Sequence, residues 1–200
     1  MAETFKFTDE HFADIQMLRY RLDGFEDLTL KQKLYIYYLA KATLCGRDIV
    51  TDQFGRHNLL IRKTLEAVYE NFVGDRTSHD FQSMTVYLKR VWFSNGIHHH
   101  YGCEKFVPDF SEPFFIEAVR QVGADKLPLA EGQTVDSLLD ELCPVIFNPS
   151  VQAKRVNQKD GDDLVKTSAC NYYENLSQKE VENFYASMRN PEDLTPISYG

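Results

Sequence analysis

Five glycines divide the first part of this sequence into segments the length of ordinary helices. They are Gly24, Gly46, Gly74, Gly96 and Gly123. Between them, apolar residues recur every three or four positions, the spacing that gives a helix one buried face. Glycine often follows the last turn of a helix because it adopts a left-handed backbone conformation at little cost. The pattern predicts a predominantly helical chain.

Ser and Thr residues stand where most of these segments begin, as helix N-caps do. Thr29 with Gln32, and Ser177 with Glu180, form capping-box patterns. We predict helices over 8–24, 29–46, 59–72, 78–96, 111–123, 134–142 and 177–188. Residues 47–57 are predicted to be a connector, and the helix over 29–46 is expected to bury nearly all of its apolar width. The short connections predict an antiparallel helical layer.

The pattern changes after Pro144, where the preceding helix is expected to stop. Two strand-like runs, 151–158 and 164–170, flank the sequence K-D-G-D-D, and Asp-Gly between such runs is typical of a β-hairpin. An isolated hairpin is marginally stable in water, so this one is expected to need further strands of a sheet or barrel. The predicted fold class is α+β, predominantly α-helical.

The charge balance argues against several classes of function. Acidic residues outnumber basic ones by 30 to 22, for a formal net charge of -8, which disfavours nucleic-acid binding and leaves basic or neutral partners. No apolar run has the length of a membrane span, and we expect a cytoplasmic protein. The four cysteines are widely separated, which predicts reduced thiols rather than a disulfide framework.

The loop over 95–110 is the most unusual local sequence, because it contains three consecutive histidines. His98 and His100 can point to one side of an extended segment and ligate a metal together with Cys103 or Glu104. The alternative is an aromatic loop whose histidines form hydrogen bonds with the backbone or solvent. Zinc-peptidase, serine-hydrolase and nucleotide-binding motifs are all missing from the sequence, so no catalytic residue and no metal ligand is assigned.

Several stretches of this chain resemble the amino-terminal part of bacterial dipeptidyl peptidase III. The most specific stretch reads V-Y-L-K-R-V-W-F-S-N-G-I-H-H-H-Y-G-C-E-K-F-V-P (86–108). Others are 14–28, 32–49 and A-C-N-Y-Y-E (169–174). The resemblance covers nearly the whole chain. It implies that 1–143 form the helical shell of an amino-terminal lobe, and that 144–200 add a hairpin and a helix to the same lobe, as an incomplete part of a small β-barrel.

The resemblance also implies a function. The family consists of two-lobed zinc exopeptidases that release dipeptides from the amino ends of peptides bound between the lobes. Its zinc motif, H-E-x-x-G-H, and its second motif, E-E-x-R-x-D, are missing here and lie beyond residue 200 in the family. We therefore expect an amino-terminal fragment that is inactive alone, has no cofactor of its own, and has the zinc-binding remainder of its polypeptide and a peptide substrate as partners. Asn95, His98, Tyr101 and Lys105 are the candidates for contact with the cleft.

Two other hypotheses remain. The chain can be a non-enzymatic module that binds a peptide or protein by adding a strand to an exposed sheet edge. It can also be a small metal-responsive protein built around the histidine triplet.

Overall fold

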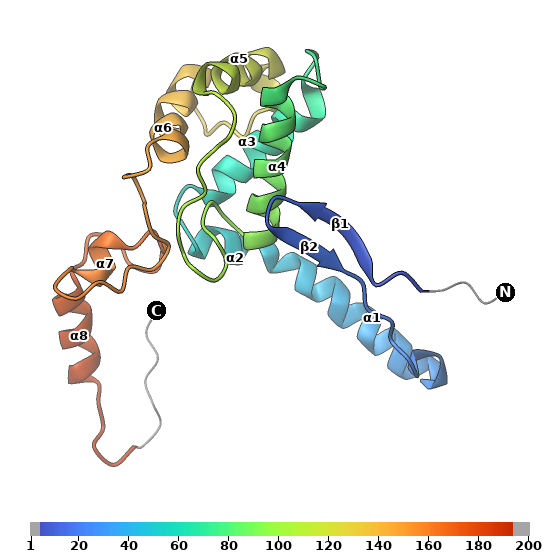
Figure 1. Cartoon of the computed structure of the whole chain (residues 1–200). Coiled ribbons are helices and arrows are strands. Elements are labelled where there is room, and N and C mark those ends of the chain that lie inside the picture. Colours follow the sequence, from blue (N-terminus) through green and yellow to red (C-terminus); the bar gives the residue numbers. More distant parts are fainter. Residues whose placement is uncertain (1–4, 194–200) are drawn as a thin grey trace. The chain divides into compact units, whose positions relative to one another are not determined.

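The chain is mostly helical and carries one antiparallel strand pair, which confirms the predicted α+β class. The computed structural model describes residues 5–193, and the chain divides into two compact units, 1–48 and 49–200. Figure 1 shows the strands β1 and β2 with helix α1 in the first unit, and helices α3 to α8 in the second. Among the described residues, none of the helices is long and apolar enough to cross a lipid bilayer.

The first unit opens with strands β1 (Thr8–Phe12) and β2 (Ile15–Leu18), so the helix predicted over 8–24 is wrong. Phe12 pairs with Ile15 across a two-residue turn in which Ala13 has a positive φ of 48°. These two side chains are the buried ones of the hairpin, and they stand three positions apart. That separation fits a helix face and a two-residue turn equally well, which explains the error.

Helix α1 (Leu30–Cys45) follows a short 3-10 turn at Phe25–Asp27. The predicted capping box is confirmed, because the Thr29 hydroxyl accepts from the amide of Gln32 while the Gln32 side chain accepts from the amide of Thr29. The predicted burial is wrong, since α1 has no buried residue. The strand pair and the short turn are the only other elements described in this unit, and they are too small to cover a helix that is apolar on several sides.

Helix α2 (Arg47–Gln53) spans the boundary of the units and replaces the connector predicted over 47–57. Its buried residue, Thr51, accepts a hydrogen bond from the Arg62 guanidinium at 3.3 Å. This hydrogen bond joins α2 to α3.

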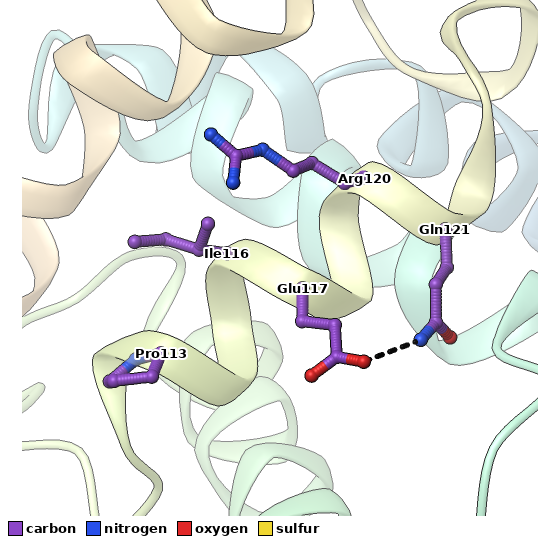
Figure 2. Close-up of a pocket in the computed structure, with 5 residues that line it drawn as sticks. All are labelled: Pro113, Ile116, Glu117, Arg120 and Gln121. Atoms are coloured by element: carbon purple, nitrogen blue, oxygen red, sulfur yellow. Dashed lines mark hydrogen bonds between the residues drawn. The ribbon is translucent and has the colours of Figure 1, made fainter.

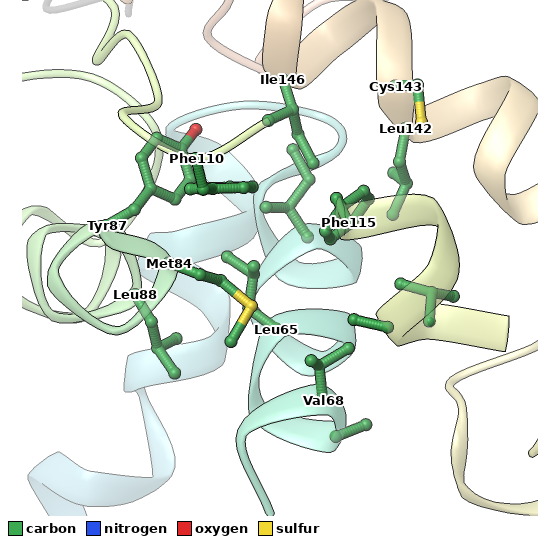
Figure 3. Packing of buried hydrophobic residues seen from close by; sticks show 14 of the residues in the cluster. Leu65, Val68, Met84, Tyr87, Leu88, Phe110, Phe115, Leu142, Cys143 and Ile146 are labelled. Carbon is green, nitrogen blue, oxygen red and sulfur yellow. The ribbon is translucent and has the colours of Figure 1, made fainter. Parts of the chain in front are cut away.

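The second unit is built on helices α3 (Asn58–Asn71), α4 (His79–Ser94), α5 (Glu112–Val122) and α6 (Val135–Phe147), with a short 3-10 turn at Ala124–Lys126. The predicted helices over 59–72, 78–96 and 111–123 are confirmed to within a few residues, including the Ser78 and Ser111 caps. Inward-facing side chains from all four helices meet in one apolar cluster (Figure 3). Leu65, Met84, Phe115 and Leu142 are fully buried in it.

Helix α6 does not stop before Pro144, as predicted, but continues to Phe147. Proline within a helix removes one backbone hydrogen bond and strains the preceding turn. Val145 and Ile146 lie in the last turn and are buried, so packing offsets that loss. The sequence prediction ended the helix because of Pro144 and did not take into account the apolar pair Val145–Ile146 that follows it.

The β-hairpin predicted over 151–170 is wrong, because this region contains turns and the short helix α7 (Leu164–Thr167). The Asp-Gly turn itself is present, with the Asp162 amide donating to the Lys159 carbonyl and Gly161 at a φ of +84°. The Asn157 side chain bonds Asp162, Thr167 and the amide of Lys159. These side-chain hydrogen bonds compete with the backbone hydrogen bonds that would pair two strands.

Helix α8 (Gln178–Ser187) ends the described part of the chain and begins at the predicted Ser177 capping box. Its amide at Gln178 donates to the carboxylate of Asp163, which also caps α7. Val181 is its one buried residue. The predicted tail after Asn190 lies partly outside the described residues.

Candidate functional site

The 95–110 loop leaves α4 through two residues with unusual backbone angles. Asn95 adopts the left-handed conformation (φ 54°), and Gly96 follows at φ +152°. Gly96 lies against the buried side chain of Asn58, whose Oδ1 accepts from the amide of Ile97 at 3.2 Å. Because a β-carbon at position 96 would overlap Asn58, glycine is required here. The start of the loop is thereby fixed to α3.

His98 is 1% exposed, and its Nε2 lies 2.6 Å from the carbonyl oxygen of Gln152. A carbonyl only accepts, so Nε2 carries the ring proton. Burial lowers the pKa of His98 to about 4, although the bond to Gln152 opposes the shift, while Lys105 and Arg155 add to it. The imidazole is therefore neutral near pH 7. Its hydrogen bond holds the loop against residue 152, and this bond occupies Nε2.

Lys105 fastens the other side of the same loop. Its Nζ donates to the carbonyls of Asn148 at 2.6 Å and Val151 at 2.8 Å, and its amide donates to the carbonyl of Ala153. Partial burial lowers the pKa of the Lys105 ammonium to about 8. The side chain ties the loop to the segment that follows α6.

A further set of bonds joins the loop to residues 154 and 155. Lys154 forms an ion pair with Glu104 at 2.6 Å. The amide of Arg155 donates to the Cys103 carbonyl, and its guanidinium lies 3.4 Å from the Cys103 sulfur and over the ring of Phe54. On the opposite side, Cys170 donates from its amide to the Arg155 carbonyl. Three extended pieces of chain thus lie side by side, with 153–155 in the middle.

The outer surface of the loop is aromatic. Tyr101 is 85% exposed, the rings of His99 and His100 stack at 4.5 Å, and His100 packs edge-on against Phe93 at 4.9 Å. Flat rings held on a braced loop provide stacking surfaces for a peptide or another aromatic group. The arrangement is suited to contact with such a group.

The structure places the four predicted cleft residues in different roles. Asn95 ends a helix, while His98 and Lys105 bond to internal carbonyls. Tyr101 alone projects into solvent. Their contact with substrate stays a prediction.

The partners of this loop could not be recognised from local sequence patterns, because Asn148, Gln152 and Arg155 stand about 50 positions away. Within residues 5–193, no group of three or more His, Cys, Asp or Glu side chains is placed to hold a metal ion. All four cysteines lie in this range and are free.

No protein-family model matches this chain, and no curated protein matches it either. The likeness to dipeptidyl peptidase III therefore stays a prediction from the sequence stretches that suggest it.

Proposed function

We propose that this chain is the amino-terminal lobe part of a dipeptidyl peptidase III-like zinc exopeptidase. In this proposal it contributes scaffold and one face of the peptide-binding cleft, and it is inactive alone. In this proposal the zinc ligands and the general base come from the remainder of the polypeptide, because the motifs H-E-x-x-G-H and E-E-x-R-x-D are missing from this sequence. The stretch 86–108 that carries the resemblance includes most of the 95–110 loop, which His98 and Lys105 hold in place.

The observation that carries the proposal is the exposure of α1. Within the first unit, its large apolar residues project on several sides, and none of them is buried. The exposed ones are Leu30, Leu34, Tyr35, Ile36, Tyr37, Tyr38, Leu39 and Leu44. A helix that is apolar all round is normally buried within a larger protein. In this proposal, the remainder of the same polypeptide packs against α1 and buries these residues.

The braced loop supplies the proposed cleft surface. His98 and Lys105 hold the loop by hydrogen bonds to three carbonyls within residues 148–152. Tyr101 projects into solvent. A stacking residue on a rigid support loses little conformational freedom when a peptide binds. In this proposal Tyr101 contacts the substrate, and His98 and Lys105 position the loop.

The proposed β-barrel has a similar basis. The extended pieces around Cys103, Arg155 and Cys170 are joined by backbone hydrogen bonds, with isolated bridges at His98–Lys105 and Glu104–Lys154. Further strands from the remainder of the polypeptide would extend this arrangement into a barrel.

Dipeptide release from a chromogenic dipeptidyl substrate in the presence of zinc tests the proposal. The assay compares these 200 residues with the same chain extended through its downstream reading frame. Activity in the extended form only is the expected result. Activity in the 200 residues alone contradicts the assignment of catalysis to the remainder, and inactivity of both forms contradicts the peptidase assignment.

Two tyrosine variants of the extended form then test the loop. Tyr101→Ala should raise KM with little change in kcat, because a contact made equally in substrate and transition state is lost. Tyr20→Ala is the matched control, since Tyr20 is 79% exposed and lies outside the loop. An equal effect of both variants, or none from Tyr101→Ala, removes Tyr101 from the cleft.

A peptide-binding module is the second candidate, and the strand pair favours it. β1 and β2 form a two-stranded sheet, so each has a side without a strand partner among the described residues. Such an edge can accept an extended peptide. Protection of β1 or β2 amides on addition of a peptide, by a chain with no peptidase activity in either form, would support this function instead.

A further inference from the structure

A groove runs between the outer faces of α5 and α6. Glu112, Ile116 and Arg120 line it from α5 at positions i, i+4 and i+8, which form one stripe of a helix. A second stripe comes from α6 and consists of Asp136, Leu139, Asp140, Cys143 and Pro144. The hollow has a volume of about 390 Å³, within the range of about 300–1,000 Å³ typical of ligand pockets. Both stripes belong to the second unit.

The groove has an apolar floor. Leu139 is 4% exposed and Cys143 is 6% exposed, and Ile116 is partly buried against the core. A second hollow on α5, of about 480 Å³, adjoins the groove and shares Ile116 and Arg120 with it. Figure 2 shows Ile116 and Arg120 projecting from the same side of α5 as Pro113. An extended peptide segment can therefore follow the apolar surface from one hollow to the next.

Carboxylates form the walls of the groove. Arg120 is its one basic residue, and it is paired with Asp136 at 2.8 Å. Glu112 and Asp140 face no cation within ion-pair distance among the residues that the structure describes. After the Arg120–Asp136 pair is set aside, two negative charges remain beside the apolar floor.

The thiol of Cys143, at the floor of the groove, is affected by the same two carboxylates. Burial raises its pKa to about 11, and the neighbouring carboxylates of Glu112 and Asp140 add to the shift. A carboxylate raises the pKa of a thiol because it disfavours the thiolate. The two carboxylates thus disfavour an anion at the floor of the groove and favour a cation placed beside them.

We propose that this groove binds a short basic peptide segment of a partner protein, with an Arg or Lys head between Glu112 and Asp140 and an apolar neighbour on Ile116 and Leu139. The long aliphatic stem of Arg or Lys suits an apolar floor that ends in carboxylates. The formal net charge of -8 on the whole chain attracts such a segment over a longer range. This site is separate from the 95–110 loop and does not depend on the peptidase proposal.

The test measures fluorescence anisotropy of a labelled Gly-Leu-Arg-Leu-Gly peptide amide titrated with the full chain at low ionic strength. The matched probe replaces arginine by citrulline, which keeps the shape and removes the charge. Binding of the arginine peptide should be at least about tenfold tighter, as expected for a charge-assisted contact. It should weaken as salt is added. Equal binding of both probes, or no binding of either, overturns the proposal.

Variants locate the site. Glu112→Gln combined with Asp140→Asn should reduce affinity about tenfold or more. Glu131→Gln combined with Asp160→Asn removes the same charge at exposed loop positions and should leave affinity nearly unchanged. An equal loss in both double variants would mean general attraction to an acidic protein. Circular dichroism checks that Glu112→Gln, at the start of α5, leaves the helix content intact.

Discussion

Replacing Gly96 with alanine should destabilise the second unit through one defined contact. The β-carbon of alanine would overlap the Nδ2 of Asn58 and lie 2.7 Å from its Cγ. Asn58 is fully buried, so its side chain has no open space to enter. Movement of Asn58 would also break the hydrogen bond from the Ile97 amide to its Oδ1.

Two costs add together. A residue other than glycine at φ +152° is strained by about 1–3 kcal/mol. A buried amide that loses its acceptor costs a further 1–3 kcal/mol or so. The free energy of unfolding should therefore fall by about 2–6 kcal/mol, a large share of the stability of an ordinary domain.

Urea denaturation followed by circular dichroism measures this change, and Gly132→Ala is the matched control. Gly132 also has a positive φ, of 77°, but a β-carbon there would meet no atom within 4 Å, so strain of about 1–2 kcal/mol is expected alone. In an Asn58→Ala background, Gly96→Ala should cost much less because the overlapping group is gone. Additive effects of the two substitutions, or equal losses for Gly96→Ala and Gly132→Ala, would refute the steric argument.

Three further predictions concern His98, Ser177 and Pro144. His98 has a folded pKa of about 4 against 6.5 unfolded, so the unfolded chain binds more protons between these values and stability should fall as pH drops from 6.5 to 4, by about 3 kcal/mol. His98→Gln should flatten that part of a plot of unfolding free energy against pH. Ser177→Ala removes the cap of α8 and should cost about 1 kcal/mol, seen as faster amide exchange over 178–181 with no change at 135–147. Pro144→Ala restores a backbone donor at an exposed position of α6 and should raise the unfolding free energy by about 1–3 kcal/mol, and a lower melting temperature would contradict this.

Local patterns predicted the helices of the second unit well. The boundaries of α3, α4, α5 and α8 depend on caps, glycines and apolar spacing, all of which lie within a few residues of the structure they determine. The β1–β2 hairpin was missed because Phe12 and Ile15 are three positions apart, a separation that fits both a helix face and a two-residue turn. The 151–170 strands were wrongly predicted because Asn157, Asp163 and Ser168 bond locally, a competition that apolar alternation does not reveal.

The candidate site was predictable only in part. Three consecutive histidines identify 95–110 as unusual, but the sequence does not tell which of them is buried. That distinction depends on Gln152 and Arg155, which approach from a distant part of the chain. The α5–α6 groove was missed for a related reason. Its two stripes are ordinary outer helix faces, and they form a groove only when the helices pack together.

The bracing of the 95–110 loop by residues 148–155 also affects the order in which the protein folds. Helices α3 and α4 are neighbours in sequence and can pack early, whereas Lys105 and His98 bond residues that lie 43 and 54 positions further along the chain. Contacts between distant residues form slowly because the chain entropy of the closed loop is lost first. On the ribosome, the α3–α4 pair can therefore form before residue 155 is made. The aromatic loop should become rigid late, and its final amide protection serves as a marker of complete folding of the second unit.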